Sequence, residues 1–154
     1  MTENNQKTTV PSVQSNAQYV KDLSFEAPGM PFVLMEMKSA PEININIDLK
    51  ADKTQNEKVF VVDLSLRLNA KMKENDKTLF LCELVYGALV TLDVPEDAKE
   101  ALLMVEVPHL IFPYARAIIA NAIREAGFPS LQISPIDFAA LYRAKLAEKE
   151  KAKA

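Results

Sequence analysis

The chain has 154 residues, of which 49% are hydrophobic, and this length predicts one globular domain that buries roughly two-thirds of its unfolded surface. The net charge of -3 argues against nucleic acid as a partner, because proteins that bind phosphate backbones usually carry a basic surface. The single cysteine, Cys82, excludes an internal disulfide. The N-terminal MTENNQKTTV lacks the apolar segment of a secretory signal or a membrane helix, so we expect a cytoplasmic protein that does not insert into membranes.

Both ends of the chain differ in composition from its middle. Residues 1–17 are polar and show no sustained hydrophobic period, so they are expected to form a flexible arm. The C-terminal AKLAEKEKAKA has good helix formers but alternating charge, and we expect residues 147–154 to be a flexible charged tail. The folded domain is therefore predicted to span residues 18–146.

The run YVKDLSFEAP, residues 19–28, predicts the first strand. Its apolar residues recur at alternating positions: Tyr19, Leu23 and Phe25. The opposite side of this strand carries Asp22 and Glu26, because successive side chains of a strand point to opposite faces. The sequence therefore places two carboxylates on a wet face, with no base on that side of the strand.

Three further strands are predicted, over residues 42–49, 58–70 and 78–92. All three alternate, and the first sets isoleucines against asparagines in EININIDL. In the last, Leu81 and Glu83 lie on the side opposite Cys82. Short polar turns, ADKTQNE and KENDK, separate the three runs, which predicts an antiparallel meander.

The second half of the chain is predicted to be helical, beginning at PEDAKE, whose acids suit the first turn of a helix. Residues 109–127 have Pro113 near the expected start of a helix and Gly127 at its C-terminal cap. The apolar residues of this helix cover more than one side, so it needs cover on two sides. An extended connector is expected over residues 127–135, and helical spacing resumes over residues 136–145.

No catalytic or metal-binding pattern emerges from the sequence, so we expect neither an enzyme nor a cofactor. Cys82 lies in an apolar strand and has no histidine paired with it to activate a thiolate. His109 is the only histidine and lacks a second ligand at helical spacing. The three glycines, Gly29, Gly87 and Gly127, are scattered, so they form no phosphate-binding loop.

Four stretches, in this order and spacing, resemble the SecB family of bacterial protein-export chaperones: YVKDLSFEAP, LFLCEL, PHLIFPYAR and AGFPSLQISPIDFAALY. The resemblance implies an α+β fold with a four-stranded antiparallel sheet and helices on one face. It also implies a homotetramer built as a dimer of dimers that holds unfolded preproteins without ATP and delivers them to the motor ATPase SecA. Some SecB-like chaperones instead guard the antitoxin of a toxin system, and the same motifs would serve that role. The lysine-rich end of this chain departs from the acidic or neutral tail of export chaperones, which puts any contact of the tail with SecA in doubt.

The resemblance also assigns a role to the wet face. In the family, the acidic positions of the first strand and the Leu-Cys-Glu strand dock a small basic, zinc-bearing segment of SecA. The matching residues are Asp22, Glu26, Leu81 and Glu83. Two alternatives remain: these carboxylates only keep an exposed strand soluble, or Asp22 and Glu26 are the paired acids of a small-ligand carrier or enzyme. The position of these two acids on the wet face weakens the second alternative.

By resemblance, unfolded clients bind in a groove between the sheet and the helical layer. A holdase recognises many chains through apolar surface, so the candidates form a group. They are Ile43, Ile45, Ile47, Phe128, Leu131, Ile133, Phe138, Leu141 and Tyr142. The alternative is that these residues are ordinary core, because a domain of strands and helices needs such residues in order to fold.

Overall fold

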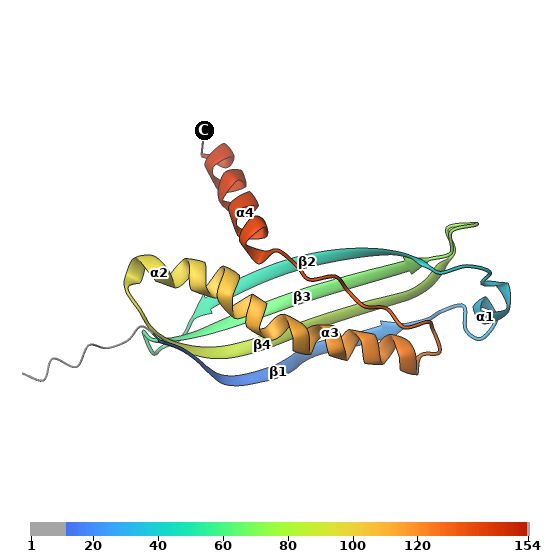
Figure 1. Cartoon of the computed structure of the whole chain (residues 1–154), viewed down its shortest axis with the longest axis horizontal. Coiled ribbons are helices and arrows are strands. Elements are labelled where there is room, and N and C mark those ends of the chain that lie inside the picture. The colour runs from blue at the N-terminus through green and yellow to red at the C-terminus, as the bar shows by residue number, and fades with distance from the viewer. Residues whose placement is uncertain (1–11, 154) are drawn as a thin grey trace, which may run out of the picture.

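The computed structural model describes residues 12–153, which form a β-sheet with helices on one of its faces (Figure 1). The elements in chain order are β1 (Ser12–Glu26), α1 (Val33–Glu36), β2 (Glu42–Lys53), β3 (Val59–Lys71), β4 (Thr78–Asp93), α2 (Glu96–Ala101), the π-helical turn η1 (Leu102–Glu106), α3 (Val107–Glu125) and α4 (Phe138–Ala152). The predicted α+β fold with a four-stranded antiparallel sheet is confirmed.

The strands lie in the order β1-β4-β3-β2, so β1 and β2 are the two edges of the sheet. The predicted meander is correct for β2, β3 and β4, which follow one another through short turns. β1 does not neighbour β2 but pairs with β4, the last strand. We call the face covered by the helices the inner face and the opposite face the outer face.

β1 is longer and less regular than the sequence predicts. It begins at Ser12, so residues 12–17, which were expected in a flexible arm, pair with β4. Residues 1–11 lie outside the described part of the chain. The register shifts twice, and at one shift Lys21 is an extra residue between two paired positions. Because one extra residue reverses the alternation, Tyr19 does not share a face with Leu23 and Phe25, and that prediction is wrong.

The ring of Tyr19 lies on the outer face, over Gly87 of β4. The two residues are paired in the register, and a Cβ built on Gly87 would lie only 2.5 Å from Cε2 of Tyr19. Leu23 and Phe25, on the other side of the bulge, pair with Leu84 and Cys82 on the inner face. Gly87 is therefore needed for the close approach of an aromatic ring from the edge strand.

The core lies between the inner face and α3. One stripe of α3, with residues four apart, is fully buried: Ile111, Ala115, Ile119 and Ile123. At the far end of α3, the ring of Phe80 lies 5.2 Å from that of Phe25 and 5.0 Å from that of Phe128, centroid to centroid. This aromatic cluster joins β1, β4 and the connector after α3.

α2, η1 and α3 form one helical segment, Glu96–Glu125, which by length and apolar composition alone could span a bilayer. Its buried stripe packs on the sheet, as in a core helix of a globular domain. Pro113 lies inside α3 rather than near the start of a helix, so that expectation is wrong. Helix α3 begins at Val107, before this proline. Because proline has no backbone N–H, Pro113 removes one internal hydrogen bond of the helix.

The C-terminal end of α3 confirms the predicted glycine cap. Gly127 has a φ of 91°, in the left-handed region that favours glycine. Its N–H donates to the carbonyl of Arg124 at 3.0 Å, and the N–H of Phe128 donates to the carbonyl of Ile123 at 3.2 Å. This pair of bonds is a Schellman motif, closed by the contact of buried Phe128 with the end of the helix.

α4 extends beyond its predicted end and projects from the body of the molecule (Figure 1). Its N-cap is Asp137, whose side chain accepts a hydrogen bond from the N–H of Ala140 at 2.9 Å. The helix continues to Ala152, so most of the segment 147–154, expected to be a flexible tail, is helical. Good helix formers outweigh the alternating charge there.

Candidate functional site: the two faces of the sheet

The four residues assigned to the wet face lie together on the outer face of β1 and β4. Glu26 pairs with Leu81 in the antiparallel register, and Asp22 pairs with Val85, four residues further along each strand. Glu83 lies between them, opposite Ser24. Directly paired residues of neighbouring strands point to the same face, so strand pairing brings these side chains into one surface.

A hollow of about 420 Å³ lies on this face where β2, β3 and β4 meet the side chain of Asp22. Two further acids reach its rim, Asp48 from β2 and Glu83 from β4, together with Arg67 from β3. Nε of Arg67 lies 3.0 Å from Oε1 of Glu83. The expectation that this side carries acids without a base is therefore wrong for the sheet, and it fails for β1 as well, where Lys21 reaches the same face. The sequence shows alternation within each strand but not the register that places Arg67 beside Glu83.

A second ion pair, deeper in the outer face, anchors β1. Nζ of Lys21 donates to Oδ2 of Asp63 at 2.8 Å, and the Asp63 side chain is only 8% exposed. This hydrogen bond raises the pKa of Lys21. The other oxygen of Asp63, Oδ1, is buried and has no partner among the described residues. The bulge residue therefore supplies the cation for a buried carboxylate on β3.

The inner face carries the apolar residues assigned to the client groove, and they divide into two sets. Three are almost wholly buried and belong to the core, as the alternative interpretation holds: Phe128, Ile133 and Phe138. The others pack at the margin of the core and are partly exposed: Ile43, Ile45, Ile47, Leu131, Leu141 and Tyr142. Figure 1 shows the connector running back from the end of α3 toward α4 on the β2 side of the helix. The exposed candidates thus line the side of the molecule that is bounded by β2.

An apolar segment at one end of this surface was not predicted. α1, in the loop between β1 and β2, exposes Phe32, Leu34 and Met35 at 66%, 44% and 85%. The Cδ1 atom of Leu34 lies about 4.0 Å from a Cβ built on Gly127, so this loop adjoins the start of the connector. The methionine-rich run GMPFVLMEM was the available signal, because flexible thioethers are common on surfaces that bind many partners.

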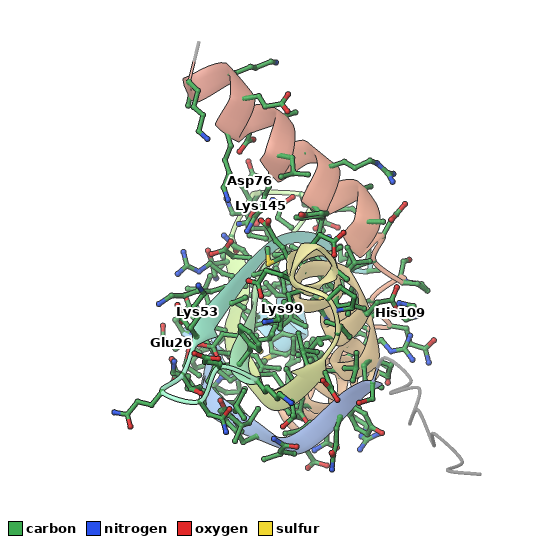
Figure 2. All side chains as sticks on the ribbon, turned by 90° about the vertical axis from the view of Figure 1, so that its left-hand side faces the viewer. Glu26, Lys53, Asp76, Lys99, His109 and Lys145 are labelled. Atoms are coloured by element: carbon green, nitrogen blue, oxygen red, sulfur yellow. The ribbon has the colours of Figure 1, made fainter. Side chains whose placement is uncertain are left out.

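The other end of the surface holds a cavity of about 530 Å³ that the sequence also failed to indicate. β2, β3, the continuous segment α2–η1 and α4 line it, and its apolar lining includes Leu49, Leu103 and Met104. Charged side chains of both signs also line it, and Figure 2 shows two of them, Lys53 and Lys99, at this end of the molecule. Three parts of the chain that are far apart in the sequence form this cavity, so no local pattern could reveal it.

The described residues contain no group of three or more His, Cys, Asp or Glu side chains arranged to hold a metal ion. Cys82 is buried on the inner face, and burial raises the pKa of its thiol. A thiol of raised pKa is a weak nucleophile at neutral pH.

Comparison with known proteins finds relatives over most of the chain. The family model of the preprotein translocase subunit SecB matches residues 5–149. The chain is 39% identical to the protein-export protein SecB of Granulibacter bethesdensis, over 91% of this chain and 85% of that protein. It is 44% identical to the protein-export protein SecB of Maricaulis maris, over 94% of this chain and 83% of that protein.

Among solved structures, the fold resembles that of the Mycobacterium tuberculosis Rv1957 SecB-like chaperone in complex with a ChAD peptide from the HigA1 antitoxin. The TM-score is 0.64, and the match covers 80% of this chain and 90% of that one. The sequence identity is 12%, so this comparison speaks to the fold alone.

Proposed function

This chain belongs to the SecB family of protein-export chaperones, and from that premise we propose that it holds unfolded preproteins on its inner face and docks SecA through its outer face. The observation that carries the proposal is the separation of the two surfaces. Alternation along β4 directs Glu83 outward and Cys82 inward, so one sheet offers an acidic surface and an apolar surface back to back. A client and a docking partner can thus be bound at the same time.

The docking role rests on charge and geometry. Leu81 is paired with Glu26, and Glu83 and Asp22 follow on the same face further along the two strands, so an apolar contact adjoins a row of carboxylates. A basic segment of SecA would meet complementary charge, which speeds encounter and sets orientation. Exposed pairs of this kind are screened over roughly 8–10 Å at ordinary ionic strength, so docking should weaken as salt rises.

The client role rests on the apolar residues along β2. Ile43, Ile45 and Ile47 present a half-buried row, and Leu141 with Tyr142 of α4 extends it. α1 and the cavity beside η1 add apolar surface at the two ends of this row. Binding spread over so long a surface suits unfolded chains, because its energy does not depend on one side chain.

We also propose that the chain assembles as a homotetramer, a dimer of dimers. Leu110 and Tyr114 on α3 are 46% and 54% exposed, although α3 is a core helix. The edge strand β1 is 15 residues long and leaves one row of backbone groups unpaired within the chain. Pairing of β1 edges would form the dimer, and α3 helices packed between two sheets would join the dimers.

The proposed cycle takes place in the cytoplasm and uses no nucleotide bound by this chain. An export chaperone must meet preproteins before translocation, so it has to act on the side where they are synthesised. The energy for transport would come from the SecA ATPase. The antitoxin-guarding role is not favoured, because the export proteins share about 40% identity with this chain and the antitoxin-bound chaperone shares 12%.

The docking proposal is tested by isothermal titration of SecA into the wild-type protein and into the double variant Asp22→Lys with Glu26→Lys. We expect the variant to bind at least roughly tenfold more weakly at low salt, since charge reversal turns attraction into repulsion. The control is Asp97→Lys with Glu148→Lys, which makes the same charge change at two exposed helix positions. Suppression of aggregation should be unchanged in both variants. Equal affinity of wild type and the Asp22/Glu26 variant would assign these carboxylates to solubility instead.

A further inference from the structure

One basic side chain stands among the residues that line the outer-face hollow. Arg67 of β3 is the single basic residue placed around this hollow of about 420 Å³, which is otherwise bordered by polar and apolar groups and three acids, Asp22, Asp48 and Glu83. In the register, Arg67 is flanked by Glu83 on β4 and by Asn46 on β2. The guanidinium group thus lies among acids that would attract a cation of a docking partner.

The ion pair between Arg67 and Glu83 is exposed to solvent, so either side chain can exchange its partner easily. Nε of Arg67 lies 3.0 Å from Oε1 of Glu83, and this is the one ion pair of Glu83 within the described residues. The two side chains are 66% and 46% exposed. Exposed ion pairs contribute little to stability because water solvates both charges, so neither partner is held tightly. Glu83 can therefore give up Arg67 for another cation at small cost.

A second acid of the hollow is also engaged from within the chain. Nζ of Lys145, in the middle of α4, lies 3.1 Å from Oδ1 of Asp48 and also donates to the carbonyl of Leu49 at 3.0 Å. Asp22 has no ion-pair partner among the described residues. Internal cations thus occupy two of the three acids on the rim.

We propose that Arg67 is an internal competitor for Glu83, which sets how strongly the outer face docks a basic partner and how steeply that docking depends on salt. The proposal rests on the docking function proposed above and adds a residue to it. A cationic side chain of the partner would displace Arg67 from Glu83, and the freed guanidinium would turn into solvent. Arg67 also repels the approaching cation directly, so its presence weakens docking in two ways.

The test is titration of SecA into wild type, Arg67→Gln, Arg67→Lys and Lys50→Gln at low and at moderate salt. Arg67→Gln should bind roughly three- to tenfold more tightly at low salt, because it removes both the competing pair and the repulsion. Its affinity should also fall more steeply with salt, since the hollow is then more negative. Arg67→Lys keeps a cation and should bind like wild type.

Lys50→Gln is the matched control. It removes one positive charge from another position on the outer face, where Lys50 pairs with Asp52 at 3.5 Å and does not line the hollow. It should change the affinity by less than roughly twofold, the effect of net charge alone. All variants should unfold at the same temperature as wild type, because the exposed pair of Arg67 with Glu83 contributes little to stability.

Two outcomes separate this proposal from the docking function. If Glu83→Gln weakens docking but Arg67→Gln binds like wild type, docking stands and the competition is overturned. If Arg67→Gln improves docking equally with and without Glu83, Arg67 acts only as a general positive charge, which also overturns the competition. A wild-type protein that does not bind SecA at all would remove the docking function itself, and with it the role of Arg67.

Discussion

The two edge strands of the sheet differ in regularity and in cover. β1 pairs with β4 through two register shifts, whereas β2 pairs with β3 without any. On the inner face, Val20 and Leu23 of β1 are 46% and 44% exposed, but the isoleucines of β2 are half-buried. The connector after α3 covers the inner side of β1 at Phe25, whereas Val20 and Leu23 are left exposed.

The difference agrees with the assembly proposed above. A long edge strand with exposed apolar side chains is a liability in a monomer, and a second copy of the chain would cover it. β2 lies beside elements of its own chain, η1 and α4, and a cavity lies between them. We therefore expect permanent assembly at the β1 edge and reversible binding at the β2 side.

The largest effect is expected from breaking the proposed contact between dimers, which α3 would make. Leu110→Asp with Tyr114→Asp places two charges on the exposed face of α3. The proposed assembly would bury these charges, at a free-energy cost of about 3–5 kcal/mol. Light scattering should then report a species smaller than the tetramer, with an unchanged circular dichroism spectrum. Leu146→Asp, at another exposed leucine, is the control and should remain tetrameric. A wild-type protein that is monomeric at micromolar concentration would contradict the assembly.

The second prediction tests the role of the β2 side in client binding. Ile45→Asp with Leu141→Asp should abolish suppression of aggregation, because each side chain contributes on the order of 1–2 kcal/mol to client binding and the new charges resist burial. The tetramer should survive. Ala140→Asp with Ala144→Asp adds the same charge to exposed positions of α4 and should hold clients normally. Loss of holding in that control but not in the first variant would place the groove elsewhere.

The smallest effect concerns the bulge that makes β1 irregular. Lys21→Met leaves the almost fully buried carboxylate of Asp63 without its cation, so the free energy of unfolding should fall by more than for the loss of an exposed pair. Denaturant unfolding at a fixed protomer concentration measures the change, because assembly contributes to apparent stability. Lys50→Met, which breaks an exposed pair, should cost less than about 0.5 kcal/mol. Equal stability of the two variants would show that the Lys21 pair does not anchor the strand.

Local patterns in the sequence determined most of the elements and one of the two surfaces. Alternation alone identified β2, β3 and β4, because a strand that buries one face must repeat every second residue. The same rule placed Asp22 and Glu26 opposite Leu23, and Glu83 opposite Cys82, on the correct faces. The cap at Gly127 was equally predictable, since its left-handed conformation is a local requirement.

Only the tertiary structure decided features that depend on which strands pair and in what register. The bulge at Lys21 turned Tyr19 to the outer face, and the pairing of β3 with β4 brought Arg67 to Glu83. Burial was also decided by the tertiary structure. Phe128 and Ile47 are both apolar, yet Phe128 lies in the core and Ile47 lies at its margin. Alternation and caps involve neighbours along the chain, whereas register, ion pairs and burial involve residues tens of positions apart, and these contacts form only when the whole sheet and its helices have assembled.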